Sequence, residues 1–263
     1  MRTLALLLLC SAAGMASAAD LKVLSAGAVE PGLAKVAEQF ARETRVKVRV
    51  LYATAPQLDR RLANGELADV LIAPPGVMNE QLRRNRVDEE NHFVIGRVGV
   101  GVVVRLGNPE PDISSLERFK QSVLGADSIV YNQASTGLYL EKLFDLLGIG
   151  EQLKPRTTRL ATGEDVLVHV SNGGGYEIGF AAITVIRQLA PGGLKYVGPL
   201  PEQIQNQTAY LAGLMVAKET KEAKEAKDGK DAKDSPTEAA AKDFLKYLAT
   251  PAAKAMFAAV GIE

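Results

Sequence analysis

The feature that most restricts the fold of this chain is a regular alternation of short apolar segments with longer amphipathic ones. Segments with helical spacing of apolar residues, such as residues 31–43 and 137–147, follow segments typical of strands. The strand-like segments lie at residues 21–25, 46–52, 69–73, 98–104, 128–131, 157–160, 177–181 and 194–197. This order predicts parallel sheets that are covered by helices on both faces.

Two interruptions of the alternation favour two lobes over one large sheet. A turn rich in proline at residues 107–111 follows the strand at 98–104, and a further apolar strand at 209–217 appears only after a second such turn. We therefore predict an α/β fold of two lobes, each a mainly parallel sheet flanked by helices, joined by two crossing segments. The expected bounds are residues 19–104 for the first part of lobe 1, 105–206 for lobe 2, and 207–263 for the second part of lobe 1.

A charged, low-complexity segment at residues 218–235 interrupts the second part of lobe 1. It consists of six tripeptides, each a lysine followed by an acid and a small residue. A period of three spreads charge around any helix and leaves no apolar face to bury. We expect a solvated insertion that takes no part in the core.

The first residues predict a signal peptide, residues 1–18, that is cleaved near Ala18. Arg2 precedes an apolar run at residues 4–9, and small residues end at the expected cleavage site. A retained anchor is the alternative, but a spanning helix needs about 20 apolar residues. Cys10, the only cysteine, falls in this segment, so the exported chain would form no disulfide. We expect a periplasmic protein.

The charges are balanced, with 31 basic and 31 acidic side chains. A neutral chain has no electrostatic basis for binding nucleic acid. The two histidines, His92 and His169, belong to no recognisable catalytic or metal-ligating pattern, and no P-loop is present. These observations favour a binding protein over an enzyme, with no cofactor and no metal.

The loops that follow the predicted strands are the expected binding site, because ligands of α/β sheets lie at the carboxyl ends of strands. These loops are small, uncharged and rich in hydroxyl groups, as at residues 132–137. Free N–H groups at the helix starts that follow would suit an anion. Ordinary helix capping by Ser135, Thr136 or Thr162 is the alternative.

Several segments, in this order, resemble the molybdate-type periplasmic solute-binding proteins of ABC importers. The similar segments are residues 23–28, 37–40, 62–70, 96–102, 136–139, 163–166 and 249–253. The resemblance implies two lobes that close over a tetrahedral oxyanion held by hydroxyl groups and backbone N–H groups. It also implies delivery of the ligand, by a monomer, to an ABC permease in the inner membrane.

Three of the side-chain donors that the resemblance implies are replaced by alanine. The serine positions correspond to Ala28 and to Ala55, beside Thr54, and the tyrosine position corresponds to Ala182. Backbone donors would lie near Thr136 and Val166, and Ser25, Thr54, Ser135 or Thr184 could supply substitute hydroxyls. We expect a molybdate-like or tungstate-like oxyanion as the ligand. A different small solute, organic solutes included, a sensor that feeds a signalling partner, and an enzyme on the same scaffold are the alternatives.

Overall fold

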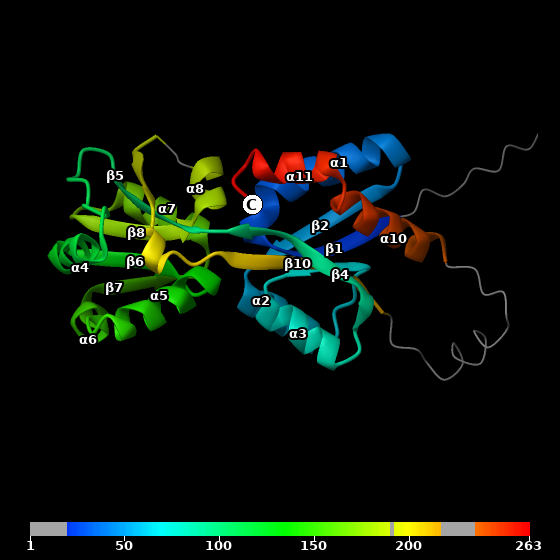
Figure 1. Ribbon diagram of the computed structural model, residues 1–263, viewed down its shortest axis with the longest axis horizontal. Helices are drawn as coiled ribbons and strands as arrows, with labels where there is room; N and C mark the ends of the chain where they lie inside the picture. The colour runs from blue at the N-terminus through cyan, green and yellow to red at the C-terminus, as the bar shows by residue number, and fades with distance from the viewer. Residues whose placement is uncertain (1–19, 190–191, 217–234) are drawn as a thin grey trace, which may run out of the picture.

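The computed structural model describes residues 20–189, 192–216 and 235–263. The predicted signal peptide at residues 1–18 and almost all of the charged segment at 218–235 lie outside the described residues, so both stay predictions. The described chain forms two α/β lobes side by side, each built on one five-stranded sheet (Figure 1). The predicted fold class is confirmed.

The sheet of lobe 1 combines four strands that run in one direction with one antiparallel strand. β1 pairs in parallel with β2 and β3, and β10 runs antiparallel between β3 and β4. In spatial order the strands are β2 (Lys47–Ala53), β1 (Asp20–Ala26), β3 (Val70–Ala73), β10 (Thr208–Met215) and β4 (Val87–Val98). The sheet therefore combines segments that lie far apart in the sequence.

The sheet of lobe 2 repeats this design. β6 pairs in parallel with β7 and β8, and β5 runs antiparallel between β8 and β9. The order is β7 (Thr157–Leu160), β6 (Ser128–Asn132), β8 (Glu177–Ala182), β5 (Val100–Arg105) and β9 (Leu194–Pro199). Because β5 belongs to this sheet, the chain leaves the first sheet at Gly99, before the predicted boundary between residues 104 and 105. The apolar pattern of 98–104 indicated a buried strand correctly but could not indicate which sheet would bury it.

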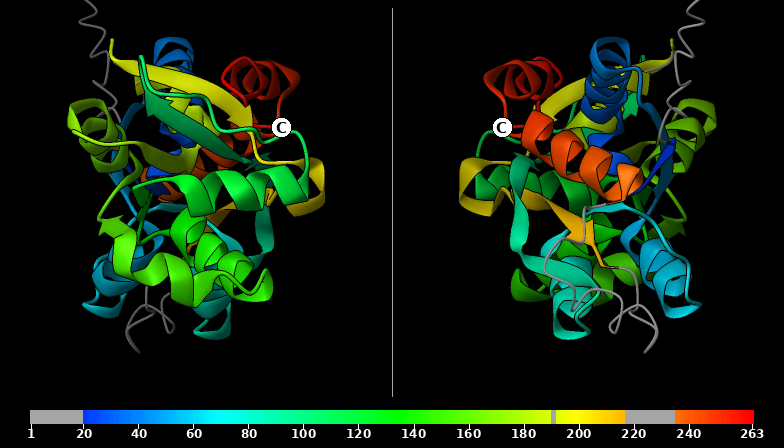
Figure 2. Two further views of the ribbon diagram at one scale, coloured as in Figure 1. Left: turned by 90° about the vertical axis from the view of Figure 1, so that its left-hand side faces the viewer. Right: turned by 90° about the vertical axis from the view of Figure 1, so that its right-hand side faces the viewer.

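Helices cover both faces of each sheet (Figures 1 and 2). In lobe 1, three helices lie on one face and two on the other: α1 (Glu30–Thr44), α10 (Pro236–Leu248) and α11 (Pro251–Ala258) opposite α2 (Ala55–Ala63) and α3 (Pro75–Arg83). Lobe 2 contains α4 (Leu116–Gly125), α5 (Ser135–Leu146), α6 (Gly150–Leu153), α7 (Gly163–Asn172) and α8 (Ile183–Leu189). Each lobe thereby has an apolar core of its own.

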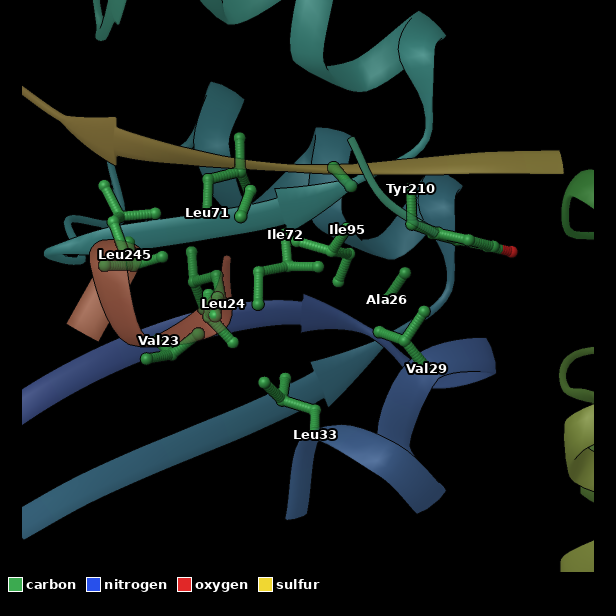
Figure 3. Packing of buried hydrophobic residues seen from close by; sticks show 14 of the residues in the cluster. Val23, Leu24, Ala26, Val29, Leu33, Leu71, Ile72, Ile95, Tyr210 and Leu245 are labelled. Carbon is green, nitrogen blue, oxygen red and sulfur yellow. The ribbon is translucent and has the colours of Figure 1, made fainter. Parts of the chain in front are cut away.

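The core of lobe 1 is formed by aliphatic side chains from its strands and helices (Figure 3). Leu24 of β1, Ile72 of β3 and Leu33 of α1 are all fully buried. Tyr210 of β10 lies at one end of this cluster, with its hydroxyl oxygen pointing away from the other labelled side chains. This end of the core faces lobe 2, so the ring is packed in lobe 1 while its polar end reaches the boundary between the lobes.

The two crossing segments are hydrogen-bonded to each other through one side chain. The Gln205 amide oxygen accepts from the Val100 N–H at 2.8 Å, and its nitrogen donates to the Val100 carbonyl at 2.9 Å. Gln205 lies between β9 and β10, whereas Val100 begins β5 just after the first crossing at Gly99. The amide thus ties together the two places where the chain passes between the lobes.

Candidate ligand-binding cleft

A cavity of about 270 Å³ lies between the two lobes. Its walls are the carboxyl ends of β1 and β2 with the starts of α1 and α2 from lobe 1, and the loops before α5, α7 and α8 from lobe 2. The polar residues of the lining are Glu30, Tyr52, Thr54, Gln57, Asn132, Ser135, Thr136, Thr162, Glu164, Gln188 and Tyr210. The site therefore occupies the edge of both sheets that the α/β topology predicts.

Six of the seven predicted ligand-binding residues line this cavity, namely Ala28, Thr54, Ala55, Ser135, Thr136 and Ala182. Val166 does not, because it lies fully buried one turn inside α7, where its N–H points to the Thr162 carbonyl at 3.3 Å. The same helix reaches the cavity through Gly163 and Glu164 instead. Whether the six residues contact a ligand stays a prediction.

The start of α5 brings donors into the cavity by a close approach to β6. The Asn132 side-chain oxygen accepts from the N–H groups of Ala134, at 3.0 Å, and Gly137, at 3.3 Å. A β-carbon at Gly137 would lie 1.6 Å from the Asn132 carbonyl oxygen, so only glycine permits this approach. The N-cap is Ala134, which has no side chain to cap the helix. The hydroxyls of Ser135 and Thr136 therefore do not cap the helix, and no N-cap side chain binds the N–H groups of these two residues.

Helix capping, which the sequence analysis gave as the alternative to ligand binding, does account for Thr162. Its hydroxyl accepts from the Asp165 N–H at 3.1 Å, while the Asp165 carboxylate accepts from the Thr162 N–H at 3.0 Å. At the start of α2, the Thr54 N–H donates to the Gln57 side chain at 2.8 Å. These local bonds fix the helix starts that form the cavity wall.

Two tyrosines and two glutamates of the lining were not predicted from the sequence. Tyr210 is only 4% exposed, and its hydroxyl makes no hydrogen bond with another described residue. Burial raises the pKa of Tyr210, and it raises the pKa of Tyr52 together with the nearby charge of Glu30. Both phenols are therefore neutral donors at ordinary pH, available to a solute in the cavity.

Burial also raises the pKa of the Glu30 carboxyl, and the negative charge of Glu164 adds to the effect. Glu30 belongs to lobe 1 and Glu164 to lobe 2. The charge of a carboxyl group of one lobe therefore acts on a carboxyl group of the other across the cleft. Their positions in the first turns of α1 and α7 are common for acids, which is why the sequence pattern alone did not single them out.

The lobes touch directly at the edge of the cavity. The Thr184 hydroxyl of α8 donates to the Ala28 carbonyl at 2.6 Å, and Ala182 packs against the core of lobe 1. Thr184 is fully buried, as is Ser25, whose hydroxyl donates to the Ala26 carbonyl at 3.2 Å. Of the four proposed substitute hydroxyls, only those of Thr54 and Ser135 belong to the cavity lining.

A second hollow of about 550 Å³ continues from the cavity past Ala55, Pro74 and Ser135. Arg97 and Lys142 line it, and neither makes an ion pair with another described residue. The inner cavity is therefore uncharged or acidic, whereas this outer hollow combines two cations with the carboxyl group of Asp59.

The histidines lie away from the cleft. His92 contacts the Glu89 carbonyl at 2.9 Å, and His169 lies 3.4 Å from Glu177. Within residues 20–189, 192–216 and 235–263, no cluster of three or more potential metal ligands occurs, and no helix is both long enough and apolar enough to cross a membrane.

Comparison with known proteins assigns the fold. The chain resembles the periplasmic molybdate-binding protein of Azotobacter vinelandii, with a TM-score of 0.69 and 18% identity over 92% of this chain and 98% of that one. The sulfate-binding protein SubI of Mycobacterium tuberculosis H37Rv gives 0.66 and 18% over 93% and 86%. PEB3 of Campylobacter jejuni, with L-phospholactate bound, gives 0.65 and 12% over 92% and 98%.

A relative by sequence comes from Pseudomonas sp. and is named aconitate isomerase. It is 30% identical over 204 residues, which make up 75% of this chain and 76% of the relative. Residues 21–228 also match the model of a family described as bacterial extracellular solute-binding proteins. With a cleft between two α/β lobes and these matches over most of its length, the chain belongs to the family of bacterial extracellular solute-binding proteins.

Proposed function

We propose that this protein captures a small organic acid outside the cytoplasm and delivers it, as a monomer, to an ABC importer. The observation that carries the proposal is the size of the cleft. A cavity of about 270 Å³ holds roughly nine water molecules at liquid density. This is more room than a tetrahedral oxyanion fills. The lining combines apolar surface with hydroxyl, amide and backbone donors, as sites for small organic molecules do.

A molybdate-like oxyanion, the ligand that the resemblance implies, has weaker support. Ala28, Ala55 and Ala182 offer no hydroxyl, and each hydrogen bond to a charged group is worth about 1.5–3 kcal/mol. The carboxyl groups of Glu30 and Glu164 oppose a dianion further, and they oppose an organic acid of the same charge equally. PEB3 carries an organic acid on the same fold, and the Pseudomonas relative is named for another.

Delivery depends on closure of the two lobes around the solute. A solute that contacts both lobes stabilises the closed state relative to the open one, and the shift equals its difference in affinity for the two states. The lining supplies contacts of this kind, because Thr54 and Tyr210 come from lobe 1 whereas Asn132 and Thr136 come from lobe 2. The closed, loaded form would then be the one that the permease recognises.

Isomerisation of an unsaturated organic acid is a second candidate function. The identity with the protein named aconitate isomerase favours it, as does a carboxyl group with a raised pKa, Glu30, in the cleft. In such a reaction the Glu30 carboxylate takes a proton from a carbon next to the double bond and returns it to the far carbon of the allylic system. The double bond shifts and no other reactant is consumed.

A thermal-shift titration tests these proposals with molybdate, sulfate, cis-aconitate, trans-aconitate and the saturated acid tricarballylate. A ligand at about 100 times its dissociation constant stabilises by roughly 2.7 kcal/mol, which raises the Tm by about 5–11 °C for a chain of this size. We expect shifts with organic acids. A shift with molybdate alone would overturn the proposal. Proton NMR of trans-aconitate incubated with the protein tests the second candidate function. Isomerisation requires the cis isomer to appear with the wild-type protein and not with Glu30→Gln.

A further inference from the structure

We propose that the solute for which this cleft is built carries an ammonium group beside its acid group, and that the ammonium lies between Glu30 and Glu164. The inference rests on the proposed function, because it narrows the class of organic acid to amino acids. It follows from the charges of the lining, from their distribution over the two lobes, and from the donors that remain free.

The lining of the inner cavity contains two carboxyl groups and, among the described residues, no lysine, arginine or histidine. Neither Glu30 nor Glu164 makes an ion pair or a side-chain hydrogen bond with another described residue. Glu30 is half-buried, whereas Glu164 is exposed at the cleft surface. A half-buried carboxylate without a partner is unfavourable, and a cation within a few ångströms relieves the cost. The cavity therefore has acceptors for a positive group and nothing of its own that satisfies them.

The two carboxyl groups come from different lobes, Glu30 from the first turn of α1 and Glu164 from the first turn of α7. They lie close enough for the charge of Glu164 to act on Glu30. Closure without a solute brings like charges together, whereas an ammonium between them replaces one repulsion by two attractions. A solute of this type would thus add to closure an attraction that an acid without the amine lacks.

The acid group has donors of its own at the start of α5. The Asn132 side-chain oxygen is held by the N–H groups of Ala134 and Gly137, so the orientation of the amide leaves its NH₂ group for the cleft. Asn132 is 5% exposed, and no described acceptor binds that NH₂ group. The first turn of α5 contains no acid, so the positive end of the helix dipole is uncompensated there. A carboxylate is the group that this end of the cavity fits.

An ordinary structural role for the glutamates is the competing explanation, because acids in a first turn stabilise helices. Glu117 also lies in the first turn of its helix, α4, and is exposed as Glu164 is, but it lines neither hollow. Glu117→Gln therefore measures the helix effect alone. Glu30→Gln and Glu164→Gln remove the same effect together with a charge in the cleft.

The experiment is calorimetric titration of the full chain and of these three variants at neutral pH and fixed ionic strength. The probes are matched pairs that differ in one amino group: L-alanine and propionate, L-aspartate and succinate, L-glutamate and glutarate. We expect at least one amino acid to bind about tenfold or more tightly than its partner. Glu30→Gln and Glu164→Gln should each remove most of that preference, and Glu117→Gln should leave it unchanged.

Equal affinity of wild type for both members of every pair would overturn the inference while leaving an organic-acid binder in place. A preference for the amino acid that persists in both cleft variants would overturn the placement of the ammonium. Binding of molybdate without binding of any acid would instead overturn the proposed function. The comparison of pairs in wild type needs no variant, and the Tm of each unliganded variant shows that it is folded.

Discussion

Replacing Gly137 by alanine tests the link between the packing of α5 and the donors of the cleft. The new β-carbon would lie 1.6 Å from the Asn132 carbonyl oxygen and 2.8 Å from the ring of Tyr131. The carbonyl belongs to β6 and is held in the sheet, so the helix start must move. Reaching a separation of even 3.0 Å requires a displacement of at least about 1.4 Å.

The displacement has two measurable consequences. Overpacking of this kind costs about 1–3 kcal/mol of unfolding free energy, sometimes more, which lowers the Tm by roughly 2–12 °C for a chain of this size. The hydrogen bond from the Gly137 N–H to the Asn132 side chain, 3.3 Å long, is also lost, so the Asn132 amide and the N–H groups of Ser135 and Thr136 leave their positions. We expect the affinity for the solute to fall by about tenfold or more.

Differential scanning calorimetry and calorimetric titration measure the two effects. Gly125→Ala is the matched control, because a β-carbon there meets nothing within 4 Å and the residue lies outside the cleft. It should be neutral or slightly stabilising, since alanine loses less backbone entropy on folding than glycine. A Gly137→Ala protein with the Tm and the affinity of wild type would refute the claim that close packing positions these donors.

Three further perturbations have defined outcomes. Tyr210→Phe should weaken binding of an acid by about 10- to 150-fold in a calorimetric titration, the value of a hydrogen bond to a charged group, without changing the unliganded Tm appreciably. Gln205→Leu leaves the buried Val100 N–H without its partner and should lower the free energy of unfolding by about 1–3 kcal/mol in urea denaturation. The contribution of Glu30 to the free energy of unfolding is complete below the ordinary pKa of a glutamate and is lost as the pH rises through its raised pKa. Glu30→Gln should therefore raise the Tm at neutral pH and should raise it less at acidic pH.

Each of these outcomes can fail in a distinct way. An unchanged affinity of Tyr210→Phe would mean that the solute does not reach that hydroxyl. An unchanged denaturation midpoint of Gln205→Leu would mean that water or a neighbouring group replaces the amide. If Glu30→Gln changed the Tm by the same amount at every pH, ionisation of the Glu30 carboxyl would not destabilise the folded protein.

The sequence predicted the architecture because the periodicity of apolar residues reports burial directly. Its errors fall where tertiary context decides. The segment 87–91 contains three acids and was not predicted as strand, yet it begins β4, which tolerates charge because it pairs with β10 alone at the edge of the sheet. The antiparallel placement of β5 and β10 depends on the crossings, which leave no mark in local periodicity.

For the cleft, the loops at the strand ends were predictable from topology, but the individual groups only in part. Small residues such as Ala28 and Thr136 follow the carboxyl ends of strands, and the strand order already places these ends at one edge of each sheet. Tyr210 and Tyr52 lie on strands and look like core residues in the sequence. Tyr210 is indeed buried and Tyr52 is half-buried, yet both also line the cavity. Glu30 and Glu164 look like helix-terminal acids until the two lobes are assembled.

The hydrogen bond from the Thr184 hydroxyl to the Ala28 carbonyl bears on the fidelity of the transport that we propose. It joins the lobes without any solute, so it supports closure of the empty protein as well. A neutral hydrogen bond is worth about 0.5–1.5 kcal/mol net, which multiplies the ratio of closed to open empty protein by roughly 2–13. In the delivery that we propose, empty closed molecules compete with loaded ones for the permease. This bond therefore sets a background of unproductive docking that repulsion between the two cleft carboxylates opposes.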